Sequence, residues 1–379
     1  MCQAVDSPDM PPPTTTTLRE EAAISRVYTR ANNGQHEEMN AHHTVGVIGG
    51  GSWGTAIAHI LRSSDMAPDT LLWMRDEATG RAISDQCENP KYLPGLRLAQ
   101  GIQVTSELEE ICTRCRQIFL VVPTKVMRSI VRELSKWLTA EHVLISCSKG
   151  LEPESAKRMT EILREETCCI RVGALSGPNL AKEVIAGQPA ATVIASRFDA
   201  VVSDATRALM GPRFRVYGNH DVLGVELAGA LKNVVAIAAG TAAGLGFGDN
   251  TKSLIVTRGL AEIRRLGDRL GANRDTFAGL AGVGDLMVTC ASPLSRNHQV
   301  GRRLAAGETL EDIRQAMHQV AEGVNTARVI HATSRRLDIS MPISTAVYQL
   351  AYEQRSPTDV LAELMANQAT YEVDRPILF

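Results

Sequence analysis

The sequence predicts an α/β domain followed by an all-helical domain, and three observations lead to this prediction. Short β-branched runs alternate with helical patterns from residue 44 to about residue 218. A glycine-rich loop follows the first of these runs. Beyond Gly218 the strand pattern stops and only helical patterns continue. Alternation of this kind is typical of a mostly parallel sheet that is covered by helices on both faces.

The expected strands are short, apolar segments that a sheet would bury on both faces. They cover residues 45–48, 71–73, 118–122, 143–146, 171–175, 191–195 and 214–217. Apolar residues at helical spacing predict helices at 55–62, 107–116, 125–138, 154–165 and about 200–209 in the first domain. In the second domain they predict a helix around Lys232 and others at 253–270, 309–320, 325–337, 345–352 and 358–365.

A chain of 379 residues can bury two separate cores, and we place the two domains at 43–218 and 219–379. Residues 1–42 contain three consecutive prolines, four threonines and few large apolar residues, so we expect them to be disordered. They have no apolar stretch long enough for a signal peptide. Met39 stands just before the first strand, so we consider it as a candidate alternative start of translation.

Composition excludes several classes of partner. Forty basic and 42 acidic residues give a net charge of −2, so no overall field attracts nucleic acid or an anionic membrane. Eight cysteines without regular spacing indicate free thiols in a reducing compartment. Cys112 and Cys115 form a C-x-x-C pair in a helical segment, but no further ligands accompany them. We therefore expect neither a zinc site nor a redox site there.

The glycine-rich loop predicts a dinucleotide site. Residues 49–54 read Gly-Gly-Gly-Ser-Trp-Gly, so Gly49, Gly51 and Gly54 fit G-x-G-x-x-G between a strand and a helix. These glycines allow a tight turn, close approach of a pyrophosphate and close packing of the helix on the strand. The hexapeptide alone is a weak signal, but its position after the first strand makes the domain Rossmann-type.

The end of the second strand bears on which cofactor binds. A site selective for NAD places a carboxylate there, whereas this chain has Arg75 first, and a guanidinium suits the 2′-phosphate of NADP. Asp76 follows immediately, so use of both cofactors stays open. The sequence therefore predicts NADPH or NADH, with NADP favoured, and no metal.

Lys232 is the only charged residue between Glu226 and Asp249. Burial disfavours the charged form of a lysine and lowers its pKa, which would make Lys232 a proton donor or acceptor near neutral pH. A lysine that extends to the helix surface is the equally weighted alternative. A membrane span is disfavoured, because Gly and Ala dominate the run and Lys-Asn interrupts it.

Eight short motifs, in order, resemble those of bacterial NAD(P)-dependent glycerol-3-phosphate dehydrogenases, and the resemblance extends from residue 45 to about residue 366. The motifs are Gly49 to Ala56, Lys149 to Glu152, Ser176 to Ala181, Gly229 to Val234, Gly282 to Leu286, Ser295 to Asn297, Val320 to Gly323 and Met341 to Ile343.

The resemblance assigns roles to the matched residues. Lys232 would transfer the proton while hydride passes between the nicotinamide and dihydroxyacetone phosphate. Substrate contacts are implied at Lys149, Gly177, Asn179, Lys232, Asp285, Ser295, Arg296 and Asn297. Cofactor contacts are implied at Ser52, Trp53, Lys149, Ala181, Arg296, Val320 and Glu322, in addition to Gly49, Gly51, Gly54 and Arg75. Two positions depart from the family pattern: Asn179 stands where many relatives have Ser or Thr, and Ala321 replaces a commoner valine.

Without the resemblance several of these residues have plainer readings. Lys149 reads as a surface lysine, and Ser295 to Asn297 as a polar loop. Asp285 lies in a glycine-rich turn and would serve equally as a helix N-cap. Trp53 reads as a packing aromatic.

The sequence thus predicts a cytoplasmic enzyme that reversibly reduces dihydroxyacetone phosphate to sn-glycerol 3-phosphate for glycerophospholipid synthesis. We expect a homodimer that neither binds nucleic acid nor inserts into a membrane. A dehydrogenase of the same architecture acting on a 3-hydroxy acid or ketopantoate is the first alternative. A dinucleotide-sensing protein without catalysis is the second, and the presence of Lys149, Lys232 and Asp285 together argues against it.

Overall fold

The computed structural model describes residues 44–317 and 321–366. The extension at 1–42, the alternative start at Met39 and the expected cofactor contact at Val320 lie outside the described residues.

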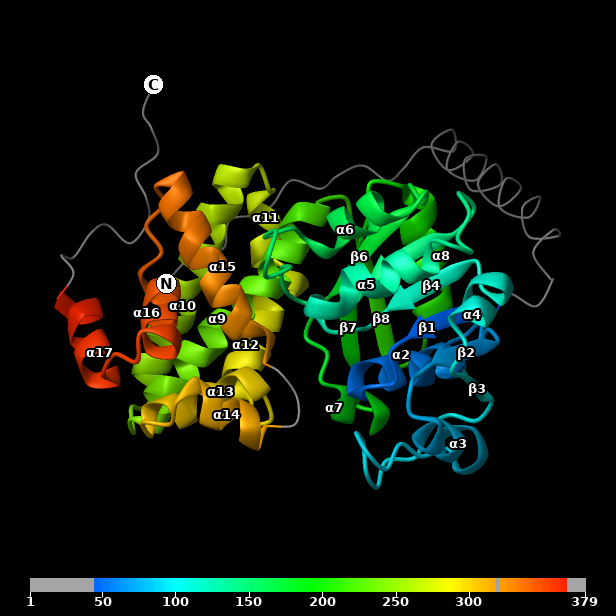
Figure 1. The fold of residues 1–379 in the computed structure, drawn as a ribbon, viewed down its shortest axis with the longest axis horizontal. Helices are drawn as coiled ribbons and strands as arrows, with labels where there is room; N and C mark the ends of the chain where they lie inside the picture. Colours follow the sequence, from blue (N-terminus) through cyan, green and yellow to red (C-terminus); the bar gives the residue numbers. More distant parts are fainter. Residues whose placement is uncertain (1–43, 318–320, 367–379) are drawn as a thin grey trace, which may run out of the picture. The chain divides into compact units, whose positions relative to one another are not determined.

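An eight-stranded sheet forms the framework of the first part of this region, in the order β3-β2-β1-β4-β5-β6-β7-β8 (Figure 1). Neighbouring strands are parallel except β6 and β7, which pair antiparallel. The strands are β1 (Val45–Ile48), β2 (Thr70–Trp73), β3 (Ile102–Thr105), β4 (Gln117–Leu120), β5 (Val143–Ser146), β6 (Val172–Ser176), β7 (Ala190–Ala195) and β8 (Phe214–Asn219). The predicted Rossmann-type α/β fold is confirmed.

Helices cover both faces of this sheet because its strands are apolar on both sides. Phe119 packs on one face with α2 and α8, whereas its neighbours Ile118 and Leu120 pack on the other face with α4, α5 and α6. The helices of this part are α2 (Ser52–Ser63), α3 (Glu77–Gln86), α4 (Leu108–Arg114), α5 (Thr124–Leu134), α6 (Met159–Glu166), α7 (Ala181–Ile185) and α8 (Asp199–Leu209).

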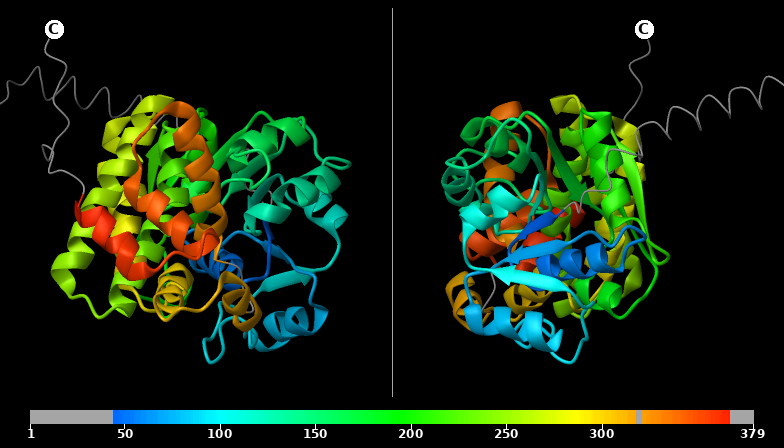
Figure 2. Two further views of the ribbon diagram at one scale, coloured as in Figure 1. Left: turned by 60° about the vertical axis from the view of Figure 1, so that its left-hand side comes forward. Right: turned by 90° about the vertical axis from the view of Figure 1, so that its right-hand side faces the viewer.

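After β8, the described residues form helices only, packed around α9 (Val222–Gly244) (Figure 2). By length and composition α9 passes the test for a membrane span, but 83% of its apolar window is buried, so it is a core helix. The other helices are α10 (Asp249–Leu270), α11 (Arg274–Ala278), α12 (Asp285–Ala291), α13 (Arg296–Ala305), α14 (Leu310–Ala316), α15 (Glu322–Leu337), α16 (Pro342–Tyr352) and α17 (Pro357–Ala366). The predicted all-helical second part is confirmed.

Several elements differ from the sequence prediction. The patterns missed β3 and α3, because β3 is partly exposed and α3 has few apolar residues. The helix expected at 154–165 begins at Met159, since residues 151–158 turn back on themselves with Leu151 bridged to Arg158. The expected turn at Gly282 is instead a π-helical turn, η1 (Leu280–Gly284), which runs directly into α12.

Candidate active site

The predicted site residues gather at the carboxyl edge of the parallel strands. The glycine loop follows β1, Lys149 follows β5, and Gly177 follows β6. Since parallel strands end at the same edge, these segments are brought together although they are far apart in sequence. Helix α9 packs against β6 and carries Lys232 to this edge.

The three fingerprint glycines are required for different reasons. Gly49 has φ +122°, and a Cβ there would lie 2.3 Å from the Val121 carbonyl oxygen. A Cβ at Gly54 would lie 1.7 Å from the Gly49 carbonyl oxygen. A Cβ at Gly51 would meet no protein atom within 4 Å. Nothing in the described protein requires Gly51 to lack a side chain, so its open space fits a bound pyrophosphate at the N-terminus of α2.

Arg75 and Asp76, at the end of β2, differ in whether their side chains are bonded within the protein. The Asp76 carboxylate caps α3 by accepting from the Thr79 N–H at 3.1 Å, and it accepts from Lys91 Nζ at 2.7 Å. Lys91 and the Thr79 N–H lower the pKa of Asp76 to about 2. Arg75 is exposed beside it. The Asp76 carboxylate is thus engaged by Thr79 and Lys91, while the Arg75 side chain is exposed to solvent.

The other residues expected near the cofactor lie in α2 and α7. Ser52 Oγ donates to the Tyr92 carbonyl oxygen at 3.3 Å. Trp53 packs against the core on its side of the sheet, and its buried Nε1 has no hydrogen-bond partner within the described part of the chain. Ala181 begins α7, the short helix that packs against α2.

Asp285 joins the two lysines at the centre of the site. Its Oδ1 accepts from Lys232 Nζ at 2.6 Å, and its Oδ2 accepts from Lys149 Nζ at 2.7 Å. Lys149 Nζ also donates to the Gly177 carbonyl oxygen at 2.8 Å. Asp285 is 1% exposed, so it serves as the counter-charge of both ammonium groups and not as a helix N-cap.

Burial changes the protonation of this group. Desolvation, reinforced by the positive charge of Lys149, lowers the pKa of Lys232 to about 8, although Asp285 opposes the shift. Burial alone would raise the pKa of Asp285, but Lys149 and Lys232 outweigh it and lower that pKa. Lys232 is 7% exposed, which excludes the alternative that it extends to the helix surface.

Thr289 orients Lys232 from the next turn of α12. Its hydroxyl donates to the Asp285 carbonyl oxygen at 2.6 Å, so its oxygen accepts from Lys232 Nζ at 2.7 Å. The sequence reasoning missed Thr289, although its spacing of four from Asp285 places it on the same helix face.

A chain of amide groups links the Lys149 loop to α15. The Asn233 side chain donates to the Lys149 carbonyl oxygen at 3.0 Å and accepts from Asn297 Nδ2 at 2.9 Å. Asn297 Oδ1 in turn accepts from the Gly323 N–H at 3.0 Å. Asn297 is 8% exposed, so both ends of its amide are engaged inside the protein. The sequence reasoning missed Asn233, which directly follows Lys232.

Glu322 connects the helical part to the sheet. Its carboxylate accepts from the Thr124 N–H at 3.0 Å and from the Thr124 hydroxyl at 2.5 Å, at the N-terminus of α5. The helix dipole favours a negative charge at that end. A Cβ at Gly150 would lie 2.9 Å from Thr124 Cγ2 and 3.3 Å from Glu322 Oε2, so the Lys149 loop passes close to this contact.

The segment Ser295 to Asn297 starts a helix and is not the polar loop that its composition suggests. Ser295 caps α13, because its Oγ accepts from the His298 N–H at 3.3 Å. Arg296 is exposed, yet the protein around it desolvates its guanidinium and lowers the pKa, with Glu322 opposing the shift.

Asn179 is engaged within the sheet. Its Nδ2 donates to the Ala191 carbonyl oxygen at 2.9 Å, and its Oδ1 accepts from the Thr192 hydroxyl at 3.0 Å. Both partners lie in β7, so Asn179 holds the turn after β6 against that strand.

The cysteines expected to be plain helix residues are buried free thiols. Burial raises the pKa of Cys112 and of Cys115 to about 12. Within 44–317 and 321–366, no group of three or more His, Cys, Asp or Glu side chains is arranged to hold a metal ion.

Comparison with known proteins identifies the family. The model for the N-terminal part of NAD-dependent glycerol-3-phosphate dehydrogenase matches residues 44–202, and the model for its C-terminal part matches residues 221–362. The chain belongs to the glycerol-3-phosphate dehydrogenase family. A glycerol-3-phosphate dehydrogenase [NAD(P)+] of Azotobacter vinelandii is 44% identical over 336 residues, which are 89% of this chain and 98% of the relative.

Two further members of the family are similar over almost the whole described chain. The corresponding enzyme of Pseudomonas aeruginosa is 42% identical over 336 residues, again 89% of this chain and 98% of the relative. The crystal structure of glycerol-3-phosphate dehydrogenase from Coxiella burnetii is 32% identical, with a TM-score of 0.81 over 86% of this chain and 99% of that one. A ketopantoate reductase from Ralstonia eutropha is 14% identical with a TM-score of 0.53, so it shares the fold alone with this member of the glycerol-3-phosphate dehydrogenase family.

Proposed function

We propose that the protein is an NAD(P)-dependent glycerol-3-phosphate dehydrogenase that reduces dihydroxyacetone phosphate to sn-glycerol 3-phosphate, a precursor of glycerophospholipids. Membership of the family supports this activity. The observation that carries the chemistry is the buried Lys149–Asp285–Lys232 cluster at the carboxyl edge of the sheet. A proton donor there lies at the edge where an α/β fold holds a dinucleotide.

The dinucleotide supplies the hydride when it is bound. Gly49, Gly51 and Gly54 would hold its pyrophosphate, and the space above Gly51 fits that group. Arg75 would bind the 2′-phosphate of NADPH, since Asp76 is already engaged with Lys91 and the α3 N-terminus. Further cofactor contacts are proposed for Ser52, Trp53, Lys149, Ala181, Arg296 and Glu322. This arrangement favours NADPH over NADH.

Lys232 would transfer the proton. Two of the three N–H bonds of its ammonium group point to Asp285 Oδ1 and Thr289 Oγ1, and the third is left for the substrate oxygen. When that third proton leaves, the two remaining hydrogen bonds keep the neutral amine in place. A pKa of about 8 allows both protonation states near neutral pH.

The neighbouring residues would bind and orient the substrate. Lys149 places a second positive charge beside Lys232 and suits a developing alkoxide or a phosphate oxygen. Arg296 can hold the phosphate through charge-assisted bonds. Gly177 and Asn179 would shape the turn that meets the substrate, while Ser295 and Asn297 would hold Arg296 and the Lys149 loop from within the protein.

The test is oxidation of NADPH in the presence of dihydroxyacetone phosphate. Lys232→Ala should lower kcat by about 10²–10⁴-fold, because a positioned acid contributes on that order. Lys252→Ala, which removes a partly exposed lysine of α10 that pairs with Asp249, is the matched control and should stay near wild type. Wild type that binds NADPH without substrate-dependent oxidation refutes the activity. Near-wild-type kcat in Lys232→Ala refutes the proton-transfer role.

A second variant, Arg75→Ala, tests the preference for NADPH over NADH. Arg75→Ala should weaken the binding of NADPH far more than that of NADH. Arg81→Ala, which removes an exposed arginine of α3 paired with Glu77, should change neither affinity. An unchanged ratio of kcat/KM for the two cofactors in Arg75→Ala would remove Arg75 from the explanation.

We also propose a homodimer in the cytoplasm. Large apolar side chains remain exposed on the helical part, among them Phe247, Leu254, Leu270, Met287 and Leu294. Light scattering should give about twice the 40.9 kDa of one chain, and a mass near 40.9 kDa would contradict the dimer. Fractionation of the native host should recover the protein with cytoplasmic enzymes.

A further inference from the structure

The segment 149–160, which begins with Lys149, is a compact element that leads from the end of β5 into the first turn of α6. Leu151 and Arg158 form an antiparallel bridge, and the Glu152 N–H donates to the Lys157 carbonyl oxygen at 2.9 Å. Leu151 is 4% exposed and packs in the core formed by α9 and α10. The segment therefore leaves the sheet, contacts the helical part and returns.

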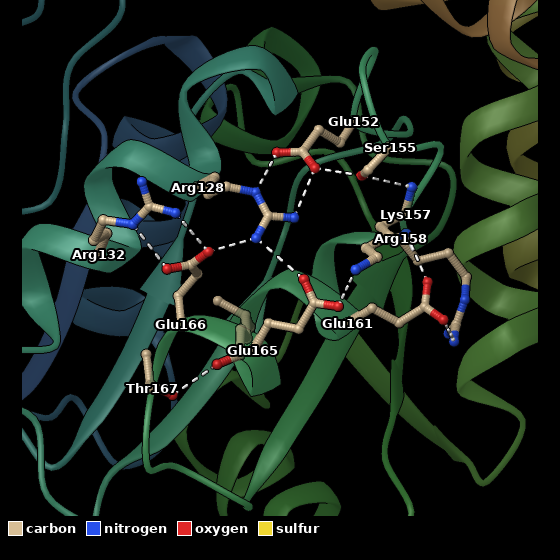
Figure 3. Close-up of polar contacts among 11 residues, drawn as sticks. Arg128, Arg132, Glu152, Ser155, Lys157, Arg158, Glu161, Glu165, Glu166 and Thr167 are labelled. Atoms are coloured by element: carbon tan, nitrogen blue, oxygen red, sulfur yellow. Dashed lines mark hydrogen bonds and ion pairs between the residues drawn. The ribbon is translucent and has the colours of Figure 1, made fainter.

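A charge cluster on the sheet side holds this segment at Glu152 (Figure 3). Arg128 of α5 donates from Nε to Glu152 Oε1 at 2.8 Å and from Nη2 to Glu152 Oε2 at 2.7 Å. The same guanidinium contacts Glu165 at 3.1 Å and Glu166 at 2.5 Å. The Glu152 side chain is 8% exposed, so this bidentate pair is shielded from water.

A second contact holds the segment on the helical side. Glu226 of α9 accepts from Arg158 Nη1 at 2.8 Å, from the Thr160 N–H at 2.9 Å and from the Thr160 hydroxyl at 2.5 Å. The Glu226 side chain is 6% exposed. Lys232 follows six residues later on the same helix, about 9 Å along its axis.

The 149–160 segment is therefore anchored twice, to Arg128 of α5 and to Glu226 of α9. One fixes the segment that carries Lys149 to the sheet, and the other fixes it to the helix that carries Lys232. We propose that Arg128 and Glu226 are positioning residues, which hold the 149–160 segment so that Lys149 keeps its ion pair with Asp285 beside Lys232. This inference rests on the proposed function of the two lysines.

The pKa of Lys232 depends on whether Lys149 is held beside it. The charged or titratable groups that act on Lys232 are Asp285 and Cys290 from α12 and Lys149 from the loop after β5. If Lys149 withdraws, Lys232 loses a like charge and keeps the full attraction of Asp285, so its pKa rises. Because reduction needs the protonated amine, the alkaline limb of the pH profile moves to higher pH.

The experiment compares Arg128→Ala with Arg132→Ala in the full-length enzyme. Arg132 belongs to the same cluster, but both of its hydrogen bonds go to Glu166, at 2.9 Å, and its side chain is 66% exposed. Reduction of dihydroxyacetone phosphate by NADPH is followed from about pH 6 to pH 10. In Arg128→Ala the midpoint of the alkaline limb of kcat/KM should move to higher pH by roughly 0.5–1 pH unit, and the KM for the substrate should rise. Arg132→Ala should follow wild type.

Two more conservative variants keep the proposal testable if Arg128→Ala does not fold. Arg128→Lys keeps the charge but cannot bond both Glu152 oxygens, and Glu226→Gln keeps the shape but loses the charge. Both should shift the limb in the same direction, with NADPH binding confirming a folded site. If the folded Arg128 and Glu226 variants show the same alkaline limb of the pH profile as Arg132→Ala, the positioning role is wrong. Wild type without activity overturns instead the proposed function on which this inference rests.

Discussion

Replacing Asp285 with Asn separates charge from shape at the centre of the site. Asp285 is the shared counter-charge of Lys149 and Lys232, so its loss leaves two neighbouring cations unpaired. Removing a close opposite charge lowers a lysine pKa by about 1–3 units. A fall of about two units takes Lys232 from about 8 to about 6. At pH 7.5 the protonated fraction then falls from about three quarters to about 3%, which is roughly a 25-fold loss of the proton donor.

The assay is kcat/KM for reduction of dihydroxyacetone phosphate, since that parameter reports the ionisation of the free enzyme. Asp285→Asn should be about 25-fold slower at pH 7.5 and should recover much of this loss near pH 5.5, where Lys232 is again protonated. Thr289→Val, which removes a hydrogen-bond acceptor of Lys232 without changing charge, should move the alkaline limb less. A loss in Asp285→Asn that is equal at every pH would refute the electrostatic explanation.

Three further substitutions test other parts of the structure. Gly51→Val should leave thermal stability near wild type, because nothing lies within 4 Å of its Cβ, but should weaken NADPH binding more than tenfold in a fluorescence titration. Gly54→Ala should instead lower stability by a few kcal/mol, since its Cβ would lie 1.7 Å from the Gly49 carbonyl oxygen; an unchanged melting temperature would contradict this. Burial raises the pKa of Glu262 from 4.5 to about 7, so its contribution to stability is full below about pH 4.5 and is lost as pH rises through 7. Relative to Glu262→Gln, wild type should therefore lose up to about 3 kcal/mol of unfolding free energy between pH 4.5 and pH 8, and parallel pH curves in denaturant titrations would contradict the shift.

Much of the fold followed from local patterns in the sequence. Apolar runs such as 45–48 and 143–146 predicted strands correctly, because a strand buried on both faces needs an unbroken apolar segment. The fingerprint between the first strand and first helix located the turn at Gly49 to Gly54. Elements with little apolar content were missed. Strand β3 is partly exposed, and α13 begins with polar residues after Ser295, whose capping role depends on the His298 N–H.

The candidate site shows where sequence reasoning ends. Residue types identified Lys232, Lys149 and Asp285, and their motifs matched one family. They did not identify Thr289. The apolar run by itself left Lys232 evenly balanced between catalysis and extension to the surface, and the glycine loop and the matched motifs then favoured catalysis by Lys232. Its exposure of 7% and its bond to Asp285, 53 residues away, decide that question.

The sequence by itself determined the order of the elements, the glycine loop and the family, because each depends on residues that are neighbours along the chain. The tertiary structure alone decided which charges meet. Lys149 and Asp285 are 136 residues apart, and their side chains meet at 2.7 Å because α9 packs against β6 of the sheet and α12 packs against α9. Since the pKa of Lys232 depends on burial and on those two charges, its suitability for proton transfer is a property of the folded protein.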